Sequence, residues 1–381
     1  MPGVPPGILD RILKSMEQSI VRIGFAGYGN FGKFLAESWS PLENVEVVAA
    51  ATSRPAEGLR VYDHWEKLLV DREVDLVAIT TPPNLHAAIA GAAMEAGKHV
   101  LIEKPVATAL SDAERLLKIR DQTKRVAAVD FMMRFTPLAE ILARWTVDKP
   151  FGDLRHAVVE NHAQDESLPP DHWFWDTAQS GGILVEHAGH FFDLLASFTD
   201  ARPLHVDGWS HRRSNGLEDT MLALVCYDNG LAATHYHAFT RPAFFERTTI
   251  RLWYDLAEVE LEGWLPISGK ILALTNAATD PAVLALPQFS EIQRSAIADG
   301  NSSRAHQVAV GGKFFPVTHQ LEGTFDVGRP KGEVYADATR SLLSDALRAI
   351  ADPDHQLRVP LESGVEALHL SIEATKRSLI G

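Results

Sequence analysis

The sequence predicts an α/β protein: an N-terminal domain with a parallel sheet, then an α+β domain with a large, mostly antiparallel sheet. Two observations lead to this fold class. Before about residue 135, short apolar runs alternate with amphipathic stretches, which is typical of a parallel sheet covered by helices on both faces. After about residue 150, longer strand-like segments follow one another across short turns such as Asp228-Asn229-Gly230, which favour antiparallel pairing.

The first domain is predicted to span residues 20–135. Residues 1–19 have some helical spacing and are expected to form an N-terminal arm. Strands are expected at 20–25, 45–51, 76–80, 100–102 and 126–129, and helices at 33–39, 65–71, 85–96 and 111–122.

The second domain is predicted to span residues 136–381. Strands are expected at 154–161, 204–212, 220–227, 232–237, 249–253 and 258–261, a helix at 183–198, and two closing helices at 333–350 and 362–379. The irregular stretch 265–330 is not assigned any element.

Charge and composition exclude several classes of protein. There are 36 Lys and Arg against 50 Asp and Glu, a net charge of −14, and no dense basic run, so we expect no nucleic-acid partner and no membrane partner. No apolar stretch reaches the roughly 18 residues that a spanning helix needs, and residues 1–19 lack a signal-peptide pattern. The single cysteine, Cys226, excludes an internal disulfide and a cysteine metal cluster. We expect a soluble, cytoplasmic protein.

A glycine-rich loop follows the first predicted strand. It contains the pattern GxGxxG, in which Gly27 permits a tight turn, Gly29 lets the backbone approach a pyrophosphate, and Gly32 allows close helix–strand packing. The helix after the loop would meet the phosphates with free N–H groups. We therefore predict a dinucleotide site, the alternative being a purely structural turn. The loop residues assigned to this site are Gly27, Tyr28, Gly29, Asn30, Phe31 and Gly32.

The end of the second predicted strand bears on the choice of dinucleotide. NAD enzymes usually place Asp or Glu there to bind the ribose 2′-hydroxyl, whereas this chain has Ser53 and Arg54. A hydroxyl beside a guanidinium suits a 2′-phosphate, so NADP(H) is favoured over NAD(H). The alternative is that Arg54 is an exposed arginine with no contact to the ribose.

Five further motifs occur in a fixed order along the chain. They are Thr80-Thr81-Pro82-Pro83-Asn84-Leu85-His86, Glu103-Lys104-Pro105, Phe131-Met132-Met133-Arg134-Phe135-Thr136-Pro137, His172-Trp173-Phe174-Trp175-Asp176 and Gly181-Gly182-Ile183-Leu184-Val185-Glu186-His187-Ala188-Gly189-His190. Together with the glycine loop, this set resembles the glucose–fructose oxidoreductase / inositol dehydrogenase (Gfo/Idh/MocA) family over most of the chain.

The resemblance implies a Rossmann domain followed by an α+β domain whose open sheet often serves oligomerisation, so a homodimer or homotetramer is expected. It implies NAD(P)-linked transfer of a hydride to or from a hydroxyl or keto carbon of a sugar, polyol or inositol-like substrate. Lys104 and His190 match the family's catalytic lysine and histidine, and Glu186 stands where the family usually has Asp. The residues that match its cofactor side are Thr81, Pro82, Asn84, His86, Glu103 and Lys104.

The chemistry of these residue types agrees with that activity. Oxidation of an alcohol needs a base with a pKa near neutrality, which a histidine such as His190 supplies, and an ammonium such as Lys104 stabilises the negative charge on the oxygen. On a regular helix Glu186 and His190 share a face. The alternatives are that Lys104 forms only a salt bridge, that His190 is a structural histidine, and that Glu186 merely partners His190.

Three residues are weaker candidates for substrate contact. Arg134 can instead form a buried ion pair, Trp173 can pack in the core, and His187 can line the pocket without binding substrate. Asn84 can likewise serve only as a helix cap. Pairs such as His235 and His237 have ligand-like spacing, but with no thiolate cluster we expect no metal.

Three functions are compatible with these motifs. The favoured one is a dehydrogenase or reductase acting on a sugar-like hydroxyl or ketone. The second is a redox-neutral, NAD-dependent glycosidase or lyase, and the third is a non-catalytic dinucleotide-binding regulator. Intact Lys104 and His190 favour the first.

Overall fold

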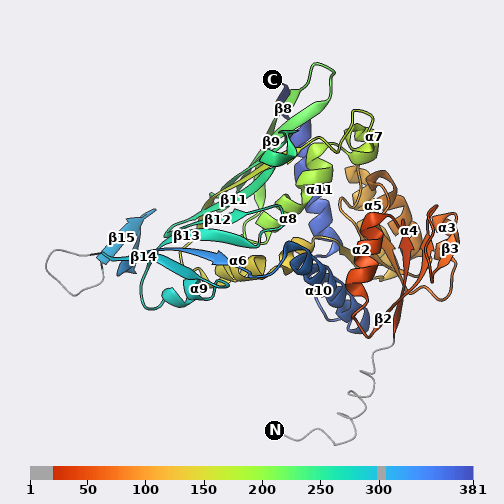
Figure 1. Cartoon of the computed structure of the whole chain (residues 1–381), viewed down its shortest axis with the longest axis horizontal. Helices are drawn as coiled ribbons and strands as arrows, with labels where there is room; N and C mark the ends of the chain where they lie inside the picture. The colour runs from red at the N-terminus through yellow and green to blue at the C-terminus, as the bar shows by residue number, and fades with distance from the viewer. Residues whose placement is uncertain (1–19, 298–305, 381) are drawn as a thin grey trace, which may run out of the picture.

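The computed structural model describes residues 20–297 and 306–380, so the predicted arm at residues 1–19 lies outside the described residues. Two sheets form the framework. Figure 1 shows the parallel domain, in red and orange, to the right of the large green sheet, with α11 running between them. Buried apolar side chains form one cluster that continues from the first domain into the second.

The first sheet is a six-stranded parallel sheet in the order β3-β2-β1-β4-β5-β6. The strands are β1 (Val21–Ala26), β2 (Val45–Ala51), β3 (Arg60–Tyr62), β4 (Leu76–Ile79), β5 (His99–Ile102) and β6 (Ala127–Val129). The helices are α2 (Asn30–Trp39), α3 (Trp65–Leu69), α4 (His86–Glu95) and α5 (Leu110–Thr123). The predicted elements are all present. The sequence analysis missed β3, a three-residue edge strand whose side chains are mostly exposed and so carry no apolar signal.

The second sheet has ten strands in the order β14-β17-β13-β12-β11-β7-β10-β9-β8-β18 and is mostly antiparallel, with β7–β10 and β8–β18 parallel. The predicted strands correspond to β7 (Leu154–Gln164), β8 (Pro203–Arg212), β9 (Glu218–Tyr227), β10 (Ala232–Arg241), β11 (Arg247–Tyr254) and β12 (Ala257–Glu262). The unassigned stretch contributes β13 (Ser268–Thr275), α9 (Asp280–Leu284), β14 (Ser290–Ala296), β17 (His319–Asp326) and a separate hairpin of β15 (His306–Val310) and β16 (Lys313–Val317).

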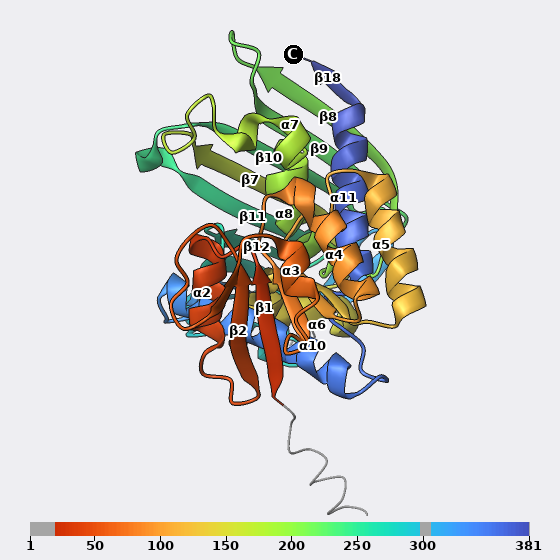
Figure 2. The same cartoon turned by 90° about the vertical axis from the view of Figure 1, so that its right-hand side faces the viewer.

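Helices cover one face of this sheet (Figure 2). The other helices of the second domain are α6 (Pro137–Asp148), which the sequence analysis missed, α7 (Thr177–Ser180), α8 (Gly189–Ala196), α10 (Lys331–Ala351) and α11 (Leu361–Lys376). Of these, α8 and α11 pack on the large sheet, whereas α10 packs against α2 and β5 of the first domain. The last predicted helix is too long at its C-terminal end, because the chain leaves α11 and forms β18 (Ser378–Ile380) beside β8. Among the described helices, none is both long and apolar enough to span a bilayer.

The predicted helix at 183–198 is not a regular α-helix. Leu184–Ala188 form a π-helix that continues into α8. The hydroxyl of Ser371, on α11, lies 3.0 Å from the carbonyl oxygen of Leu184 and 2.8 Å from that of Ala367, and it shares its one proton between them. A side chain that takes up a helix carbonyl in this way allows a wider turn at that point. This turn determines where Glu186 points.

Candidate active site

The candidate site lies at the carboxyl edge of the parallel sheet. Because all six strands run in the same direction, the segments that follow β1, β4, β5 and β6 meet at this edge. They are the glycine loop, residues 80–83, residues 103–105 and residues 130–131. The π-helix and α8 of the second domain provide the facing residues.

The glycine loop has the geometry that a dinucleotide requires. Gly27 has φ +88°, and a Cβ there would lie 2.8 Å from the carbonyl oxygen of Thr80, so only glycine fits. A Cβ on Gly29 would meet nothing within 4 Å, which leaves the backbone open to a ligand. A Cβ on Gly32 would lie 3.1 Å from the carbonyl oxygen of Gly27, so this glycine permits close packing.

The first turn of α2 fits a pyrophosphate. The helix has no side-chain cap and no acidic residue in its first turn, so its leading N–H groups, which begin at Asn30, lack side-chain acceptors. The side chains of Tyr28 and Phe31 serve packing: Tyr28 meets the ring of Phe25 edge-on at 5.3 Å, and Phe31 stacks on Phe34 at 6.1 Å.

The predicted ribose-binding residues follow β2 on the surface. Ser53 and Arg54 are both exposed. The backbone N–H of Arg54 donates to Oγ1 of Thr52 at 3.1 Å. Within residues 20–297 and 306–380, the Arg54 guanidinium has no hydrogen-bond or ion-pair partner, so it is free to bind an anion.

The segment after β4 is held by a buried histidine. His86, 1% exposed, has Nδ1 2.7 Å from the carbonyl oxygen of Pro105 and Nε2 2.8 Å from that of Thr81. Burial lowers the pKa of His86, so its neutral ring carries one N–H and donates to one of these two carbonyl oxygens. Pro82 and Asn84 are exposed, and the Asn84 side chain caps neither the 3-10 turn Pro83–Leu85 nor α4.

The contact between Lys104 and Glu186 joins the two domains. Lys104 Nζ donates to the Glu186 carboxylate at 2.9 Å and to its carbonyl oxygen at 2.6 Å, with both side chains largely buried. Burial opposes the charge on Lys104, but Glu186 and Glu103 outweigh it and raise the Lys104 pKa. Burial likewise opposes the charge on Glu186, yet Lys104 lowers its pKa. Both groups are therefore charged at neutral pH.

His190 lies beside this ion pair in an aromatic setting. Its ring meets Phe131 at 5.8 Å and Trp264 at 5.2 Å, both edge-on. Burial, and then the positive charge of Lys104, keep its pKa well below the usual value, so the imidazole is neutral. Its Nδ1 is enclosed without a hydrogen-bond partner among the described residues, and Glu186 bonds to Lys104 and not to this ring.

Two carboxyl groups flank Lys104, the half-buried Glu103 and the buried Asp130. Glu103 accepts a hydrogen bond from the backbone N–H of Lys104, whereas neither carboxyl oxygen of Asp130 has a partner among the described residues. Burial raises the pKa of both carboxyls, against the effect of Lys104. Sequence reasoning missed Asp130, although an acidic residue directly after the apolar strand β6 was a usable signal.

The three weaker candidates have different surroundings. Arg134 forms a bidentate ion pair with Asp193, as in the alternative that the sequence analysis left open for this residue. His187 places Nε2 3.1 Å from Oδ1 of Asn161, and burial lowers its pKa to about 4. The ring of Trp173 packs against His172 at 5.4 Å, and the structure does not bring it to Lys104. The described residues hold no group of three or more His, Cys, Asp or Glu side chains placed to bind a metal.

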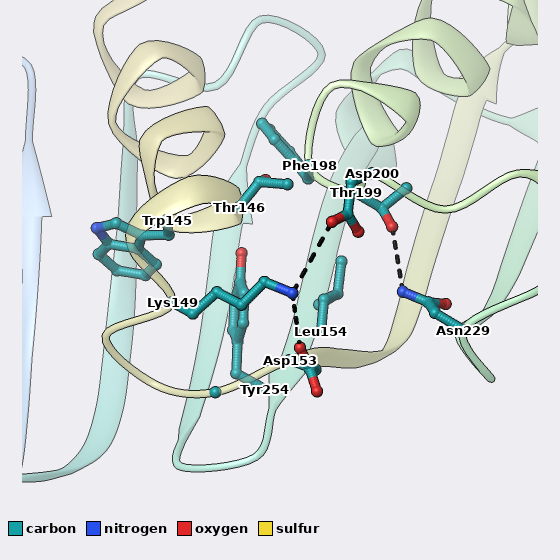
Figure 3. Close-up of a pocket in the computed structure, with 11 residues that line it drawn as sticks. Trp145, Thr146, Lys149, Asp153, Leu154, Phe198, Thr199, Asp200, Asn229 and Tyr254 are labelled. Carbon is teal, nitrogen blue, oxygen red and sulfur yellow. Dashed lines mark hydrogen bonds and ion pairs between the residues drawn. The ribbon is translucent and has the colours of Figure 1, made fainter.

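A separate small pocket lies away from this site, at the C-terminal end of α6 (Figure 3). Lys149 bridges Asp153 at 3.0 Å and Asp200 at 3.9 Å across it. None of the predicted site residues lines it.

Comparisons with known proteins agree with this geometry. Residues 21–131 match the model described as oxidoreductase family, NAD-binding Rossmann fold, and residues 142–252 match the GFO/IDH/MocA C-terminal domain. The chain is 27% identical over 226 residues to a 1-carboxy-3-chloro-3,4-dihydroxycyclohexa-1,5-diene dehydrogenase of Comamonas testosteroni, covering 56% of each chain. It is 29% identical over 196 residues to inositol 2-dehydrogenase of Rhizobium meliloti, covering 49% of this chain and 57% of the relative. The alignments thus span little more than half the length of these relatives.

Solved structures extend the likeness in fold over nearly the whole chain. An oxidoreductase domain protein from Kribbella flavida superposes with a TM-score of 0.74 at 20% identity, covering 94% of this chain and 97% of the other. UDP-N-acetylglucosamine 3-dehydrogenase from Acidithiobacillus ferrooxidans gives 0.69 at 18% identity with the same coverage. With both domain models matched in order, the chain belongs to the Gfo/Idh/MocA oxidoreductase family.

Proposed function

We propose that this protein is an NADP(H)-preferring oxidoreductase that transfers a hydride between nicotinamide and a hydroxyl or keto carbon of a sugar or polyol. The observation that carries the proposal is the buried ammonium of Lys104, held by Glu186 beside the neutral imidazole of His190. The bound nicotinamide supplies the hydride chemistry.

Each side chain has a distinct part in the reaction. Lys104 donates a hydrogen bond to the reacting oxygen and stabilises negative charge on it. His190, neutral at pH 7, accepts the hydroxyl proton during oxidation and returns it during reduction. Glu186 orients the ammonium through two contacts and balances its charge in a buried setting.

The free guanidinium of Arg54 supports the preference for NADP(H). An Arg54→Ala variant is expected to lose affinity for NADP⁺ and to keep its affinity for NAD⁺, measured by thermal shift with each cofactor. Ligand at about 100 times its dissociation constant adds roughly 2.7 kcal/mol of stability, enough to separate the two. A wild-type shift that is larger with NAD⁺ refutes the preference.

Activity is tested on purified protein with a panel of sugars and polyols, by the absorbance of reduced nicotinamide. Lys104→Met is expected to lose turnover and keep the cofactor thermal shift. Lys118→Met, a change at an exposed lysine of α5, is the matched control and should behave as wild type. Wild-type turnover in Lys104→Met contradicts the assigned role.

A further inference from the structure

A row of buried polar side chains lies in the large sheet beneath α8. Asn161 on β7 stands opposite His237 on β10 and opposite Thr248 on β11. The three residues are 2%, 0% and 4% exposed. Burial of a polar group in an apolar core costs free energy unless the group is hydrogen-bonded. The hydrogen bonds of these three residues therefore indicate the role of the row.

The hydrogen bonds of Asn161 determine the protonation pattern of His187. Asn161 Nδ2 donates to Thr248 Oγ1 at 2.8 Å, so Oδ1 is the atom that faces His187 Nε2, at 3.1 Å. An amide oxygen only accepts hydrogen bonds. With the Asn161 amide oriented in this way, His187 carries its proton on Nε2, which leaves the lone pair on Nδ1.

His187 Nδ1 is available beside the candidate active site. His187 follows Glu186 in the chain, and the charges of Glu186 and Lys104 both act on its ring. Its ring packs on Phe239 at 5.0 Å and on His237 at 5.6 Å. Nδ1 makes no hydrogen bond with any residue that the structure describes, and the neutral ring keeps this nitrogen an acceptor at pH 7.

We propose that Asn161 and Thr248 are positioning residues that fix the Nε2–H form of His187, so that Nδ1 accepts a hydrogen bond from a second hydroxyl of the substrate. The inference rests on the proposed function and narrows it. The substrate carries a hydroxyl on a carbon next to the reacting one, as sugars and polyols do. An alcohol without that hydroxyl leaves Nδ1 unpaired and reacts less well.

The position of the proton is measured directly, without substrate. Full-length protein labelled with ¹⁵N-histidine gives long-range ¹H–¹⁵N spectra that distinguish the two neutral forms, and His187→Phe identifies the His187 signals. We expect the Nε2–H form in wild type and in Thr248→Ser, and a mixture of forms in Thr248→Val and Asn161→Leu. An Nδ1–H form in wild type, or unchanged signals in Asn161→Leu, overturns the proposal. Because no turnover is needed, this failure differs from failure of the proposed function.

Kinetics test the contact with substrate. With the best polyol of the panel, Thr248→Val is expected to raise KM about tenfold with little change in kcat, and Thr248→Ser to restore it. With the analogue that lacks the adjacent hydroxyl, the same variant should match wild type. Thr249→Val, on the opposite face of β11, is the matched control. Equal losses with both substrates refute the specificity role.

Discussion

Removal of the Arg134 guanidinium should destabilise the protein by leaving a buried charge unpaired. Arg134 Nε lies 2.7 Å from one carboxylate oxygen of Asp193 and Nη2 lies 2.5 Å from the other, and Nη1 donates to the carbonyl oxygen of Arg358 at 3.1 Å. The Asp193 side chain is 1% exposed. An Arg134→Met change therefore strands a carboxylate in the core.

The expected cost is about 3–5 kcal/mol, the range for breaking one side of a buried pair. Burial already raises the Asp193 pKa to about 6 despite Arg134, so the stranded carboxyl will take up a proton and the cost should be near the lower end at pH 5. The double change Arg134→Met with Asp193→Leu removes both charges and should recover most of the loss.

Urea unfolding followed by circular dichroism at pH 7 and pH 5 measures these differences. Arg115→Met is the matched control, because its partner Asp112 lies 3.4 Å away with both side chains about half exposed, and such pairs contribute less than about 1 kcal/mol. If Arg134→Met unfolds as wild type but raises KM for the polyol, Arg134 is a substrate contact and the ion-pair interpretation is wrong.

Packing and burial support three further predictions. Gly364→Ala on α11 places a Cβ 2.3 Å from Val106 and should cost about 1–3 kcal/mol in urea unfolding, whereas Gly332→Ala on α10, where nothing lies within 4 Å, should be neutral or better. His235 is fully buried and its pKa is lowered to about 3, so as the pH drops the unfolded chain takes up a proton on this ring at a higher pH than the folded protein does. The free energy of unfolding should therefore fall as the pH drops from about 6.5 towards 3. His235→Leu should reduce this pH dependence, measured as urea midpoints between about pH 7 and pH 5. Gly27→Ala should abolish the cofactor-induced thermal shift, because its Cβ collides with the carbonyl of Thr80 after β4; an undiminished shift contradicts the assigned loop geometry.

Local sequence predicted the first domain and its glycine loop well, because strand, turn and helix signals there lie within a few residues of each other. Lys104 and Glu186 were both singled out as candidates through the family resemblance of short motifs, but their direct contact was not predicted, since it joins residues 82 positions apart. The π-helix was not predicted for the same reason, because the contact between Ser371 and the carbonyl oxygen of Leu184 joins residues 187 positions apart.

Asn161 and Thr248 show what the alternation of inward-facing and outward-facing residues along a strand can predict from the sequence. Both residues occupy inward-facing positions of strands whose other inward residues are apolar, so a polar side chain there was a readable signal. Their pairing depends on strand register, which is set by the order of strands in the sheet and not by either segment alone. Trp264, which packs on His190, comes from a loop with no such pattern.

Because of the π-helix, the direction in which the Glu186 side chain points can change without a change in the direction of His190. A π turn holds one more residue than an α turn, so it acts as a one-residue insertion that rotates the helix residues before it by about 100° relative to those after it. Deleting one residue within Leu184–Ala188 would swing the acid away from Lys104 and leave the imidazole on its original helix face. The reach of the acid and the placement of the base can thus change independently, by insertion or deletion instead of substitution.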